Sequence, residues 1–285
     1  MAGVVYLNGR LMPADEARVS PLDRGLLYGY GLFETVRSYG GRVFRLDRHL
    51  ARLMGGAETL ALASGLDPAQ LEQAMYRTVE ANGLADARIR LTVTAGAGER
   101  SLGMPSPGSL TILVVAEPLH LPSRIYDEGI SAAVVSVRRN SQSPVSSIKS
   151  LNYLDGLIAR AEAETRGADE AVLLNERGYL AECSSSNIFL VSSGKLLTPS
   201  VASGILPGVT REAVLEVAAE VGIESVEGDV LPDELARADE VFITTSVREV
   251  VPVVAVDGRL AGSGKPGPVT GRLATAYREL VRREL

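Results

Sequence analysis

Apolar and polar positions along the first third of the chain change period several times, and each change predicts an element of secondary structure. The predicted elements are a strand at Val4–Leu7, a strand at Gly31–Tyr39, a helix from Asp47 to about Ala63, a helix from Pro68 to about Ala81, and strands at Arg88–Ala95 and Leu110–Ala116. Ile89, Leu91 and Val93 alternate with polar residues and share one face of their strand. Helices packed on a sheet are therefore expected here.

The pattern stops at Pro118-Leu119-His120-Leu121-Pro122 and resumes with different elements. They are a strand at Ile130–Val137, a helix from about Asn152 to Thr165, strands at Glu170–Asn175, Tyr179–Glu182, Asn187–Val191 and Leu196–Thr198, a helix from about Thr210 to Val221, strands at Ser225–Val230, Glu240–Thr244 and Val250–Val256, and a helix near Val269–Arg283. Strands and helices do not alternate strictly, which favours an α+β fold over a doubly wound sheet. We expect an N-terminal domain at 1–117, a linker at 118–124 and a larger domain at 125–285.

Composition narrows the class of protein. Hydrophobic residues make up 46% and charged residues 22% of 285 positions, close to globular averages, and no apolar run approaches the roughly 20 residues that cross a bilayer. The net charge of −6 comes without a basic stripe, which argues against nucleic acid as the main partner. Met1–Tyr6 lacks the pattern of a secretion signal. We expect a cytoplasmic protein that acts on small molecules.

The sequence lacks the residues required for a zinc site and for a Ser-His-Asp triad. One cysteine and two histidines, His49 and His120, are too few for a zinc cluster, so we expect no metal site. The chain has no Gly-x-Ser-x-Gly segment. His49 lies in an arginine-rich helical segment and His120 lies in the predicted linker, so neither sits where a triad would need it.

Lysine is rare in this chain, with three lysines against 26 arginines. Lys195 and Lys265 lie in segments with flanking glycines that are typical of loops. Lys149 instead lies between Val145–Ile148 and Leu151–Leu154, among small and apolar residues. A lysine that loses hydration without an acidic partner has a lowered pKa and can act as a nucleophile or base. The alternative is a lysine at a strand end whose ammonium group reaches water.

Two glycine-rich segments resemble nucleotide-binding loops only superficially. Gly25–Gly31 follows no buried strand and leads into no helix, and Gly264-Lys265 has Arg259 where a phosphate loop requires glycine and Pro266 where it requires Ser or Thr. Both segments are interpreted as turns.

Four other segments offer better candidate chemistry. Pro207-Gly208-Val209-Thr210 begins a helix, whose free N–H groups suit a phosphate, although an ordinary helix start reads the same way. Glu182 ends an apolar strand and needs a donor partner there. Arg48 and Arg52 lie four apart on one helical face, either as a solvated stripe or as an anion ligand. Thr244-Thr245-Ser246 closes a strand with hydroxyl groups.

An isolated lysine, a strand carboxylate, an arginine and a helix-start anion site are the parts that hold pyridoxal phosphate. In this set and order, from Tyr6-Leu7-Asn8-Gly9 to Gly264–Thr270, the chain resembles the class IV (fold type IV) pyridoxal-phosphate enzymes. These include branched-chain and D-amino acid aminotransferases, R-selective amine transaminases and aminodeoxychorismate lyase. The resemblance implies a small N-terminal α/β domain and a larger C-terminal domain with a mixed, barrel-like sheet. It also implies a homodimer.

The resemblance assigns roles to individual residues. Lys149 would form a Schiff base with the cofactor and shuttle the substrate Cα proton, and Glu182 would bind the pyridine nitrogen. The phosphate would be held by Arg48, Val209, Thr210 and Ser246. Tyr153 is similar to the tyrosine that binds the phenolic oxygen, although it follows the lysine one residue too early. The residues implied to face the substrate are Phe33, Thr35, Arg37, Arg90 and Val247, and Arg37 and Arg90 are equally typical of surface arginines.

The residues implied to face the substrate resemble two different members of the family. Phe33-Glu34-Thr35 has threonine where branched-chain enzymes have glycine, and this threonine and Arg90–Gly96 resemble aminodeoxychorismate lyase. Glu182–Asn187, in contrast, resembles the D-amino acid aminotransferases. We expect a transaminase acting on an amino acid, branched-chain or D-configured, or on an R-amine, with a 2-oxo acid as partner. A lyase of 4-aminobenzoate synthesis and a non-catalytic homologue are the alternatives.

Overall fold

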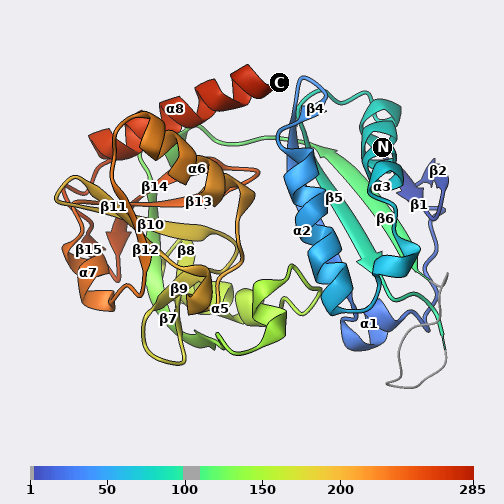
Figure 1. Cartoon of the computed structure of the whole chain (residues 1–285), viewed down its shortest axis with the longest axis horizontal. Helices are drawn as coiled ribbons and strands as arrows, with labels where there is room; N and C mark the ends of the chain where they lie inside the picture. Colours follow the sequence, from blue (N-terminus) through green and yellow to red (C-terminus); the bar gives the residue numbers. More distant parts are fainter. Residues whose placement is uncertain (1–2, 99–109) are drawn as a thin grey trace. The chain divides into compact units, whose positions relative to one another are not determined.

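The computed structural model describes residues 3–98 and 110–285. Met1 and Ala2, part of the N-terminal segment considered above, lie outside the described residues. Contacts divide the described chain into two units (Figure 1). Unit 1 holds the residues up to His120 together with Ile148–Asn152 and Leu285, and unit 2 holds Leu121–Ser147 and Tyr153–Glu284.

Within the described residues, unit 1 contains a six-stranded antiparallel sheet in the order β2-β1-β6-β5-β3-β4. The strands are β1 (Val4–Leu7), β2 (Arg10–Pro13), β3 (Gly31–Tyr39), β4 (Arg42–Val43), β5 (Ala87–Thr94) and β6 (Thr111–Pro118). Strand β4 pairs only with Ser38 and Tyr39, at the end of β3. The beginning of β3 is therefore open on that side to another segment of the chain.

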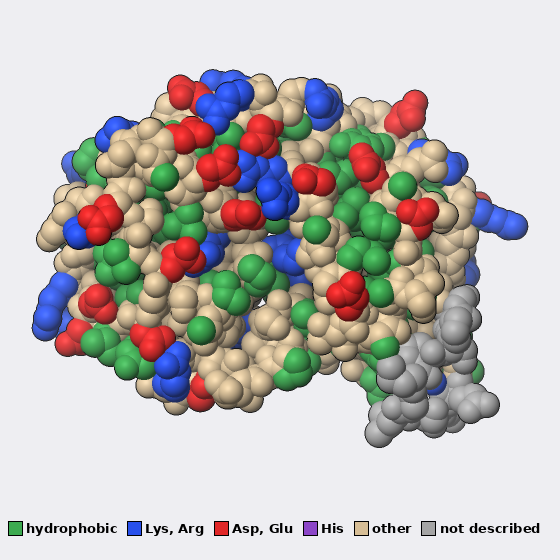
Figure 2. Space-filling view, in the orientation of Figure 1, with side chains coloured by type: hydrophobic (Ala, Val, Ile, Leu, Met, Phe, Trp, Pro, Cys, Tyr) green, Lys and Arg blue, Asp and Glu red, His purple; other side chains and the backbone are tan. Residues whose placement is uncertain are grey.

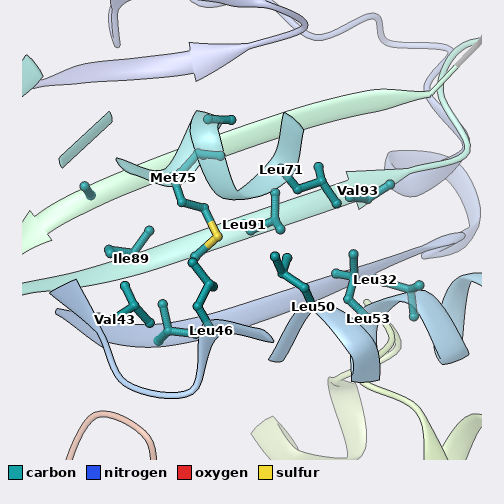
Figure 3. Packing of buried hydrophobic residues seen from close by; sticks show 14 of the residues in the cluster. Leu32, Val43, Leu46, Leu50, Leu53, Leu71, Met75, Ile89, Leu91 and Val93 are labelled. Carbon is teal, nitrogen blue, oxygen red and sulfur yellow. The ribbon is translucent and has the colours of Figure 1, made fainter. Parts of the chain in front are cut away.

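Two helices, α2 (Leu46–Thr59) and α3 (Pro68–Ala81), cover one face of this sheet, and the short 3₁₀ helix η1 (Ala63–Gly65) lies between them in the chain. Leu50 and Leu53 of α2 and Met75 of α3 pack against Ile89 and Leu91 of β5 (Figure 3). The alternation predicted for β5 thus buries its apolar side chains under the helices, as the period of two requires. The opposite face of β5 carries its polar positions, Arg88, Arg90, Thr92 and Thr94.

Local sequence explains where two helices begin. Asp67 accepts a hydrogen bond from the Ala69 amide at 3.0 Å, and Pro68 occupies the first turn of α3, where a missing N–H costs nothing. The short helix α1 (Arg24–Tyr28) is capped by Asp23 in the same way and ends at Gly29, whose φ of 64° suits glycine. The Gly25–Gly31 segment therefore contains a helical turn and leads directly into β3.

Within the described residues, unit 2 is built on a nine-stranded mixed sheet in the order β12-β11-β10-β13-β14-β7-β8-β9, with β15 paired to β14. The strands are β7 (Ile130–Arg139), β8 (Glu170–Asn175), β9 (Leu180–Cys183), β10 (Asn187–Ser192), β11 (Lys195–Pro199), β12 (Ser225–Gly228), β13 (Glu240–Thr245), β14 (Glu249–Val256) and β15 (Arg259–Leu260). Parallel pairs join β14 to β7, β7 to β8 and β11 to β12, and the other pairs are antiparallel.

Helices pack against particular strands of unit 2. They are α4 (Arg124–Asp127), α5 (Leu154–Thr165), α6 (Val209–Glu220), α7 (Pro232–Arg237) and α8 (Pro268–Glu284), with short 3₁₀ turns η2 (Pro144–Ser147) and η3 (Val201–Ser203). Ala159 and Ala163 of α5 pack on β7 and β8, and a separate apolar cluster lies among β7–β10, β13 and β14. Alanine on α5 permits close contact between helix and sheet.

The sequence predicted domains at 1–117 and 125–285 with a linker at 118–124, and these limits stay a prediction. The contacts add one short segment to unit 1 that the predicted limits place in the larger domain. Ile148–Asn152 belongs to unit 1, because the Phe33 amide donates to the Lys149 carbonyl and the Leu151 amide donates to the Gly31 carbonyl, each at 2.9 Å. Lys149, expected within the larger C-terminal domain, is therefore held by β3.

The surface carries charges of both signs. On the face shown in Figure 2, acidic and basic side chains are interspersed, a distribution that favours solubility over binding to a polyanion. None of the helices in the described ranges is both long and apolar enough to cross a membrane.

Candidate active site

Lys149 lies against the beginning of β3, next to a short antiparallel bridge between Leu32 and Ser150. Gly31 makes this approach possible, because a Cβ at this position would lie 2.4 Å from the Val93 carbonyl oxygen and 2.8 Å from Leu151 Cδ1. The backbone around Lys149 is thus fixed by hydrogen bonds to one strand. Its ammonium nitrogen lies 4.5 Å from the centroid of the Phe33 ring.

The face of β3 opposite the helices carries a group of cations around one aromatic ring. Phe33 is buried, and the Arg90 guanidinium lies over its ring at 3.9 Å from the centroid. Thr35 is the cross-strand partner of Arg90, and the Arg37 guanidinium lies over the Tyr39 ring at 4.3 Å. Four of the residues expected to face the substrate, Phe33, Thr35, Arg37 and Arg90, therefore share one sheet face with Lys149 nearby.

The helix-covered face of β3 holds a buried polar network around Glu34. Arg52 of α2 donates to both Glu34 oxygens, at 2.8 Å and 2.7 Å, and His49 Nδ1 lies 3.0 Å from Glu34 Oε2. Burial alone would raise the pKa of Glu34, but Arg52 and His49 lower this pKa from 4.5 to about 2. Burial also lowers the pKa of His49 from its ordinary 6.5. Arg52 is consequently fixed beside an ionised carboxylate.

Arg48, assigned to the phosphate from the sequence, lies in a different environment from Arg52. Its side chain is 60% exposed and its Nε is 3.8 Å from Asp47 Oδ2, whereas the Arg52 side chain is 11% exposed. The four-residue spacing indicated a shared helical face, but the residues differ in depth. Arg52 is the buried arginine of this pair, and its guanidinium donates to both oxygens of Glu34.

Glu182, at the end of β9, has two donor partners in unit 2. Its Oε1 lies 3.0 Å from the Arg139 guanidinium, and its Oε2 accepts the Leu206 amide hydrogen at 3.0 Å. Arg139 itself is anchored to the carbonyl oxygens of Ser146 and Gly204. A carboxylate withdrawn from water at a strand end is stabilised by donors of this kind.

Val209 and Thr210 form the first turn of α6, and both are buried. The cap residue is Gly208, which offers no side chain to the amides of this turn. A Cβ at Gly208 would collide with Asn187 Oδ1, so a larger residue here would force the Asn187 side chain to move. Asn187 in turn donates to the Leu206 carbonyl at 3.0 Å. The strand β10 thus holds the α6 start with its N–H groups open to an anion.

Ser246 and Val247 lie in the turn between β13 and β14, both partly exposed. The Arg248 amide closes this turn by donating to Thr245 Oγ1 at 2.8 Å. Thr244 Oγ1, buried at the end of β13, has no hydrogen-bond partner within the described residues. The strand end therefore offers hydroxyl groups that can bind a further polar ligand.

The remaining candidates are placed as follows. Tyr153 caps the start of α5. Lys195 lies on the surface, with Nζ 2.8 Å from Glu224 Oε1, and Lys265 lies in the loop before α8. Burial raises the pKa of the Cys183 thiol well above its ordinary value, which keeps this thiol protonated. In the part of the chain that the structure describes, no group of three metal-binding side chains occurs.

The chain is similar to known aminotransferases over nearly its whole length. Residues 31–256 match the family described as amino-transferase class IV. A Methanocaldococcus jannaschii protein provisionally named a branched-chain-amino-acid aminotransferase is 40% identical over 277 residues, covering 97% of this chain and 96% of the relative. The D-alanine aminotransferase of Bacillus licheniformis is 34% identical over 280 residues, covering 98% of each.

The chain belongs to the class IV aminotransferases. Its structure matches that of Escherichia coli branched-chain amino acid aminotransferase with a TM-score of 0.94 and 32% identity, covering 99% of this chain and 95% of the other. It also matches the branched-chain amino acid aminotransferase of Thermobaculum terrenum, solved in its PLP-bound holo form, with a TM-score of 0.89 and 30% identity over 100% and 95% of the two chains.

These similarities confirm several expectations. This class IV aminotransferase has the fold of fold type IV, with a smaller sheet domain and a curled, half-barrel mixed sheet. It is a transaminase, and its cofactor is pyridoxal 5'-phosphate. An amine, a carboxylate that accepts hydrogen bonds and a helix start without a side-chain cap are the kinds of group that suit the aldehyde, the ring nitrogen and the phosphate of that cofactor.

Sequence reasoning missed three charged side chains that hold polar networks in the two units. Glu34 and Arg139 were not singled out, and Glu170, a buried carboxylate at the start of β8, was taken only as a strand residue. The signal for Glu34 and Glu170 was present, because each is an acidic residue within an apolar strand, the same argument that was applied to Glu182. Arg139 carried no such signal in a chain with 26 arginines.

Proposed function

We propose that this class IV aminotransferase moves an amino group between an amino acid, branched-chain or D-configured, or an R-amine, and a 2-oxo acid, through a Schiff base at Lys149. Pyridoxal phosphate supplies an aldehyde for the amino group and an electron-withdrawing ring. The observation that carries the proposal is the fixed position of Lys149 against β3, beside Phe33 and Arg90. The relatives named above, which include branched-chain and D-alanine aminotransferases, support it.

The chain's own residues would divide the work as follows. The Lys149 amine, once displaced by the substrate, would take the proton from the substrate Cα and deliver it to the carbon that carried the cofactor aldehyde, so that the amino group stays on the cofactor and water releases the keto acid. Glu182 would keep the ring nitrogen protonated, supported by its ion pair with Arg139. Tyr153 would bind the phenolic oxygen. Arg37 and Arg90 would bind substrate carboxylates, with Phe33, Thr35 and Val247 shaping the space around the side chain.

Replacing Lys149 with Ala tests the central assignment, with Lys195→Ala as the matched control at an exposed lysine. We expect Lys149→Ala to lose turnover and the visible absorption of the lysine-bound cofactor, and we expect Lys195→Ala to keep both. Borohydride reduction of the wild type, followed by peptide mass spectrometry, should attach the cofactor mass to Lys149. Attachment at another lysine, or full activity of Lys149→Ala, would overturn the assignment.

Substrate identity requires a donor panel. Purified enzyme would be given L-branched-chain acids, D-alanine, an R-amine and aminodeoxychorismate, each with a 2-oxo acid acceptor. We expect a keto product from at least one of the first three. Release of pyruvate with 4-aminobenzoate from the last, without transamination of the others, would favour the lyase alternative.

For the phosphate, we propose Arg52 in place of Arg48, together with Val209, Thr210 and Ser246. Support comes from the burial of Arg52 and its two hydrogen bonds to Glu34, which keep the guanidinium in one orientation. We expect Arg52→Gln to weaken binding of pyridoxal phosphate by at least about tenfold, the scale of one charge-assisted bond, and Arg48→Gln to leave binding within about twofold. Equilibrium titration of the apoenzyme measures both, and the reverse ranking would restore Arg48.

We also propose a homodimer, located in the cytoplasm. Leu154, Leu157 and Ile158 of α5 are 65%, 62% and 50% exposed, and Leu26 of α1 is 71% exposed. Exposed apolar groups of this kind are typical of surfaces that are covered in an assembly. Analytical ultracentrifugation would test the assembly, and a monomer at micromolar concentration would contradict it. Cell fractionation would test the location.

A further inference from the structure

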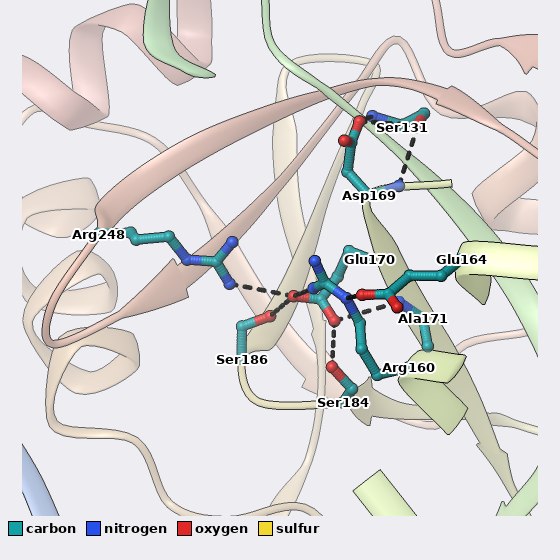
Figure 4. Close-up of polar contacts among 9 residues, drawn as sticks. All are labelled: Ser131, Arg160, Glu164, Asp169, Glu170, Ala171, Ser184, Ser186 and Arg248. Atoms are coloured by element: carbon teal, nitrogen blue, oxygen red, sulfur yellow. Dashed lines mark hydrogen bonds and ion pairs between the residues drawn. The ribbon is translucent and has the colours of Figure 1, made fainter. Parts of the chain in front are cut away.

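Glu170 is a fully buried carboxylate that the function above does not use. It begins β8, and its side chain is 0% exposed. Arg248 donates to its Oε2 at 3.0 Å, Ser186 Oγ lies 3.5 Å from the same oxygen, and Ser184 Oγ donates to Oε1 (Figure 4). The Arg160 guanidinium lies 3.7 Å from Oε2. A carboxylate withdrawn from water requires such a set of donors.

The partners of Glu170 come from segments that carry proposed cofactor contacts. Ser184 and Ser186 lie in the loop after Glu182, between β9 and β10. Arg248 follows Ser246 and Val247 in the turn between β13 and β14. One buried side chain on β8 therefore contacts both the loop beside the ring-binding glutamate and the turn that offers Ser246.

The turn is also held by contacts of its backbone. Besides the strand ladder, the Arg248 amide donates to Thr245 Oγ1 at 2.8 Å, and the Tyr126 hydroxyl donates to the Arg248 carbonyl at 3.1 Å. Both contacts are made by the backbone of Arg248. The hydrogen bond to Glu170 fixes the Arg248 side chain, and through it the turn is linked to β8 in the interior of unit 2.

We propose that Glu170 is a positioning residue for the phosphate-binding turn. By holding the Arg248 guanidinium, it fixes Thr245–Arg248 in the conformation that presents Ser246, and by binding Ser184 and Ser186 it fixes the loop after Glu182. The proposal rests on the proposed function, in which Ser246 contacts the cofactor phosphate. It predicts that loss of the Glu170 carboxylate weakens phosphate binding more than it weakens binding of the cofactor ring.

The test compares two ligands of the full-length apoenzyme, pyridoxal phosphate and pyridoxal, which lacks the phosphate. Dissociation constants are measured by absorbance titration for the wild type and for Glu170→Gln, which keeps the size of the side chain. We expect about tenfold weaker binding of pyridoxal phosphate, the lower end of the roughly 10- to 100-fold effect of removing a supporting partner, and about twofold or less for pyridoxal. Equal weakening of both ligands, or no weakening, overturns the proposal.

Two further variants separate positioning from general stability. Glu164→Gln removes the exposed carboxylate that lies 2.9 Å from Arg160 Nε, without touching Arg248, and should bind both ligands as the wild type does. Arg248→Met breaks the Glu170 contact from the partly exposed side and should reproduce the selective loss. It also keeps the proposal testable if Glu170→Gln yields no folded protein.

The double variant Glu170→Gln/Arg248→Met should bind pyridoxal phosphate no more weakly than the weaker single variant, because both changes remove one contact. Fully additive losses would mean that the two residues act separately, and would overturn the proposal. A wild type that fails to bind pyridoxal phosphate would instead overturn the proposed function, so the two failures are distinguishable.

Discussion

Glu34 in unit 1 and Glu170 in unit 2 are buried carboxylates, and each receives its hydrogen bonds from a different kind of arrangement. Both lie on strands and both are almost completely withdrawn from water, at 1% and 0% exposure. The partners of Glu34, His49 and Arg52, lie one turn apart on the single helix α2 and are themselves 3% and 11% exposed. A carboxylate with partners on one rigid element fixes one contact between helix and strand.

The partners of Glu170 differ in both origin and depth. They come from α5, from the loop after β9 and from the turn after β13, and the Arg248 and Arg160 side chains are 24% and 36% exposed. These arginines already contact water, whereas the Arg52 side chain is largely buried. We therefore expect Glu34 to matter chiefly for stability, and Glu170 chiefly for the positions of its loops.

The largest expected effect is on the free energy of unfolding of Glu34→Ala. Removing this carboxylate leaves the Arg52 guanidinium buried without its partner, which typically costs about 3–5 kcal/mol. Glu170→Gln keeps hydrogen-bond acceptors and has partly exposed partners, so about 1–3 kcal/mol is expected. Guanidinium denaturation of the apoenzyme measures both values. Equal losses in the two variants would remove the distinction between the two networks.

The pH dependence of stability sharpens the same comparison. The pKa of Glu34 is about 2 in the folded protein and 4.5 as its ordinary value. The stabilisation is therefore present above pH 4.5 and is lost as pH falls from there toward 2, and at about 1.4 kcal/mol per pH unit it amounts to about 3 kcal/mol. We expect Glu34→Gln to flatten the decline of unfolding free energy over this range.

The matched control for this pH experiment is Glu176→Gln. Hydrogen bonds from the Ser141 hydroxyl and amide lower the pKa of Glu176, but this glutamate lies at the surface. Water screens its interactions, so its replacement should change the acid decline much less. A control variant as flat as Glu34→Gln would show that burial is not what makes the Glu34 network important.

Sequence patterns predicted the elements around both glutamates more fully than their contacts. The helical period predicted a start at Pro68 for α3, and the alternation of Ile89 and Leu91 predicted the shared face of β5, because both signals are local. Helix α5 begins at Leu154, two residues later than expected, since Ile148–Asn152 pairs with β3. A short stretch that pairs with a distant strand has no repeating pattern of apolar residues, so the sequence did not predict it.

The same limit applies to the candidate site. The positions of Glu182, Thr210 and Ser246 at strand and helix ends could be predicted, because such ends follow from local signals. The choice between Arg48 and Arg52 could not, since helical spacing gives a shared face but says nothing about which residue meets a carboxylate from another strand. Only the position of Glu34 on the helix-covered face of β3 distinguishes the two arginines.

The smallest expected effect comes from an ion pair with good geometry but no burial. Arg177 donates to both oxygens of Asp229 at 3.0 Å and 2.8 Å, much as Arg52 does to Glu34, yet the Arg177 and Asp229 side chains are 43% and 37% exposed. Exposed pairs contribute about 0–1 kcal/mol, because water already solvates both charges. Arg177→Ala should therefore change the unfolding free energy by less than about 1 kcal/mol. A loss as large as that of Glu34→Ala would mean that two-point geometry, rather than burial, determines how much a carboxylate pair contributes in this enzyme.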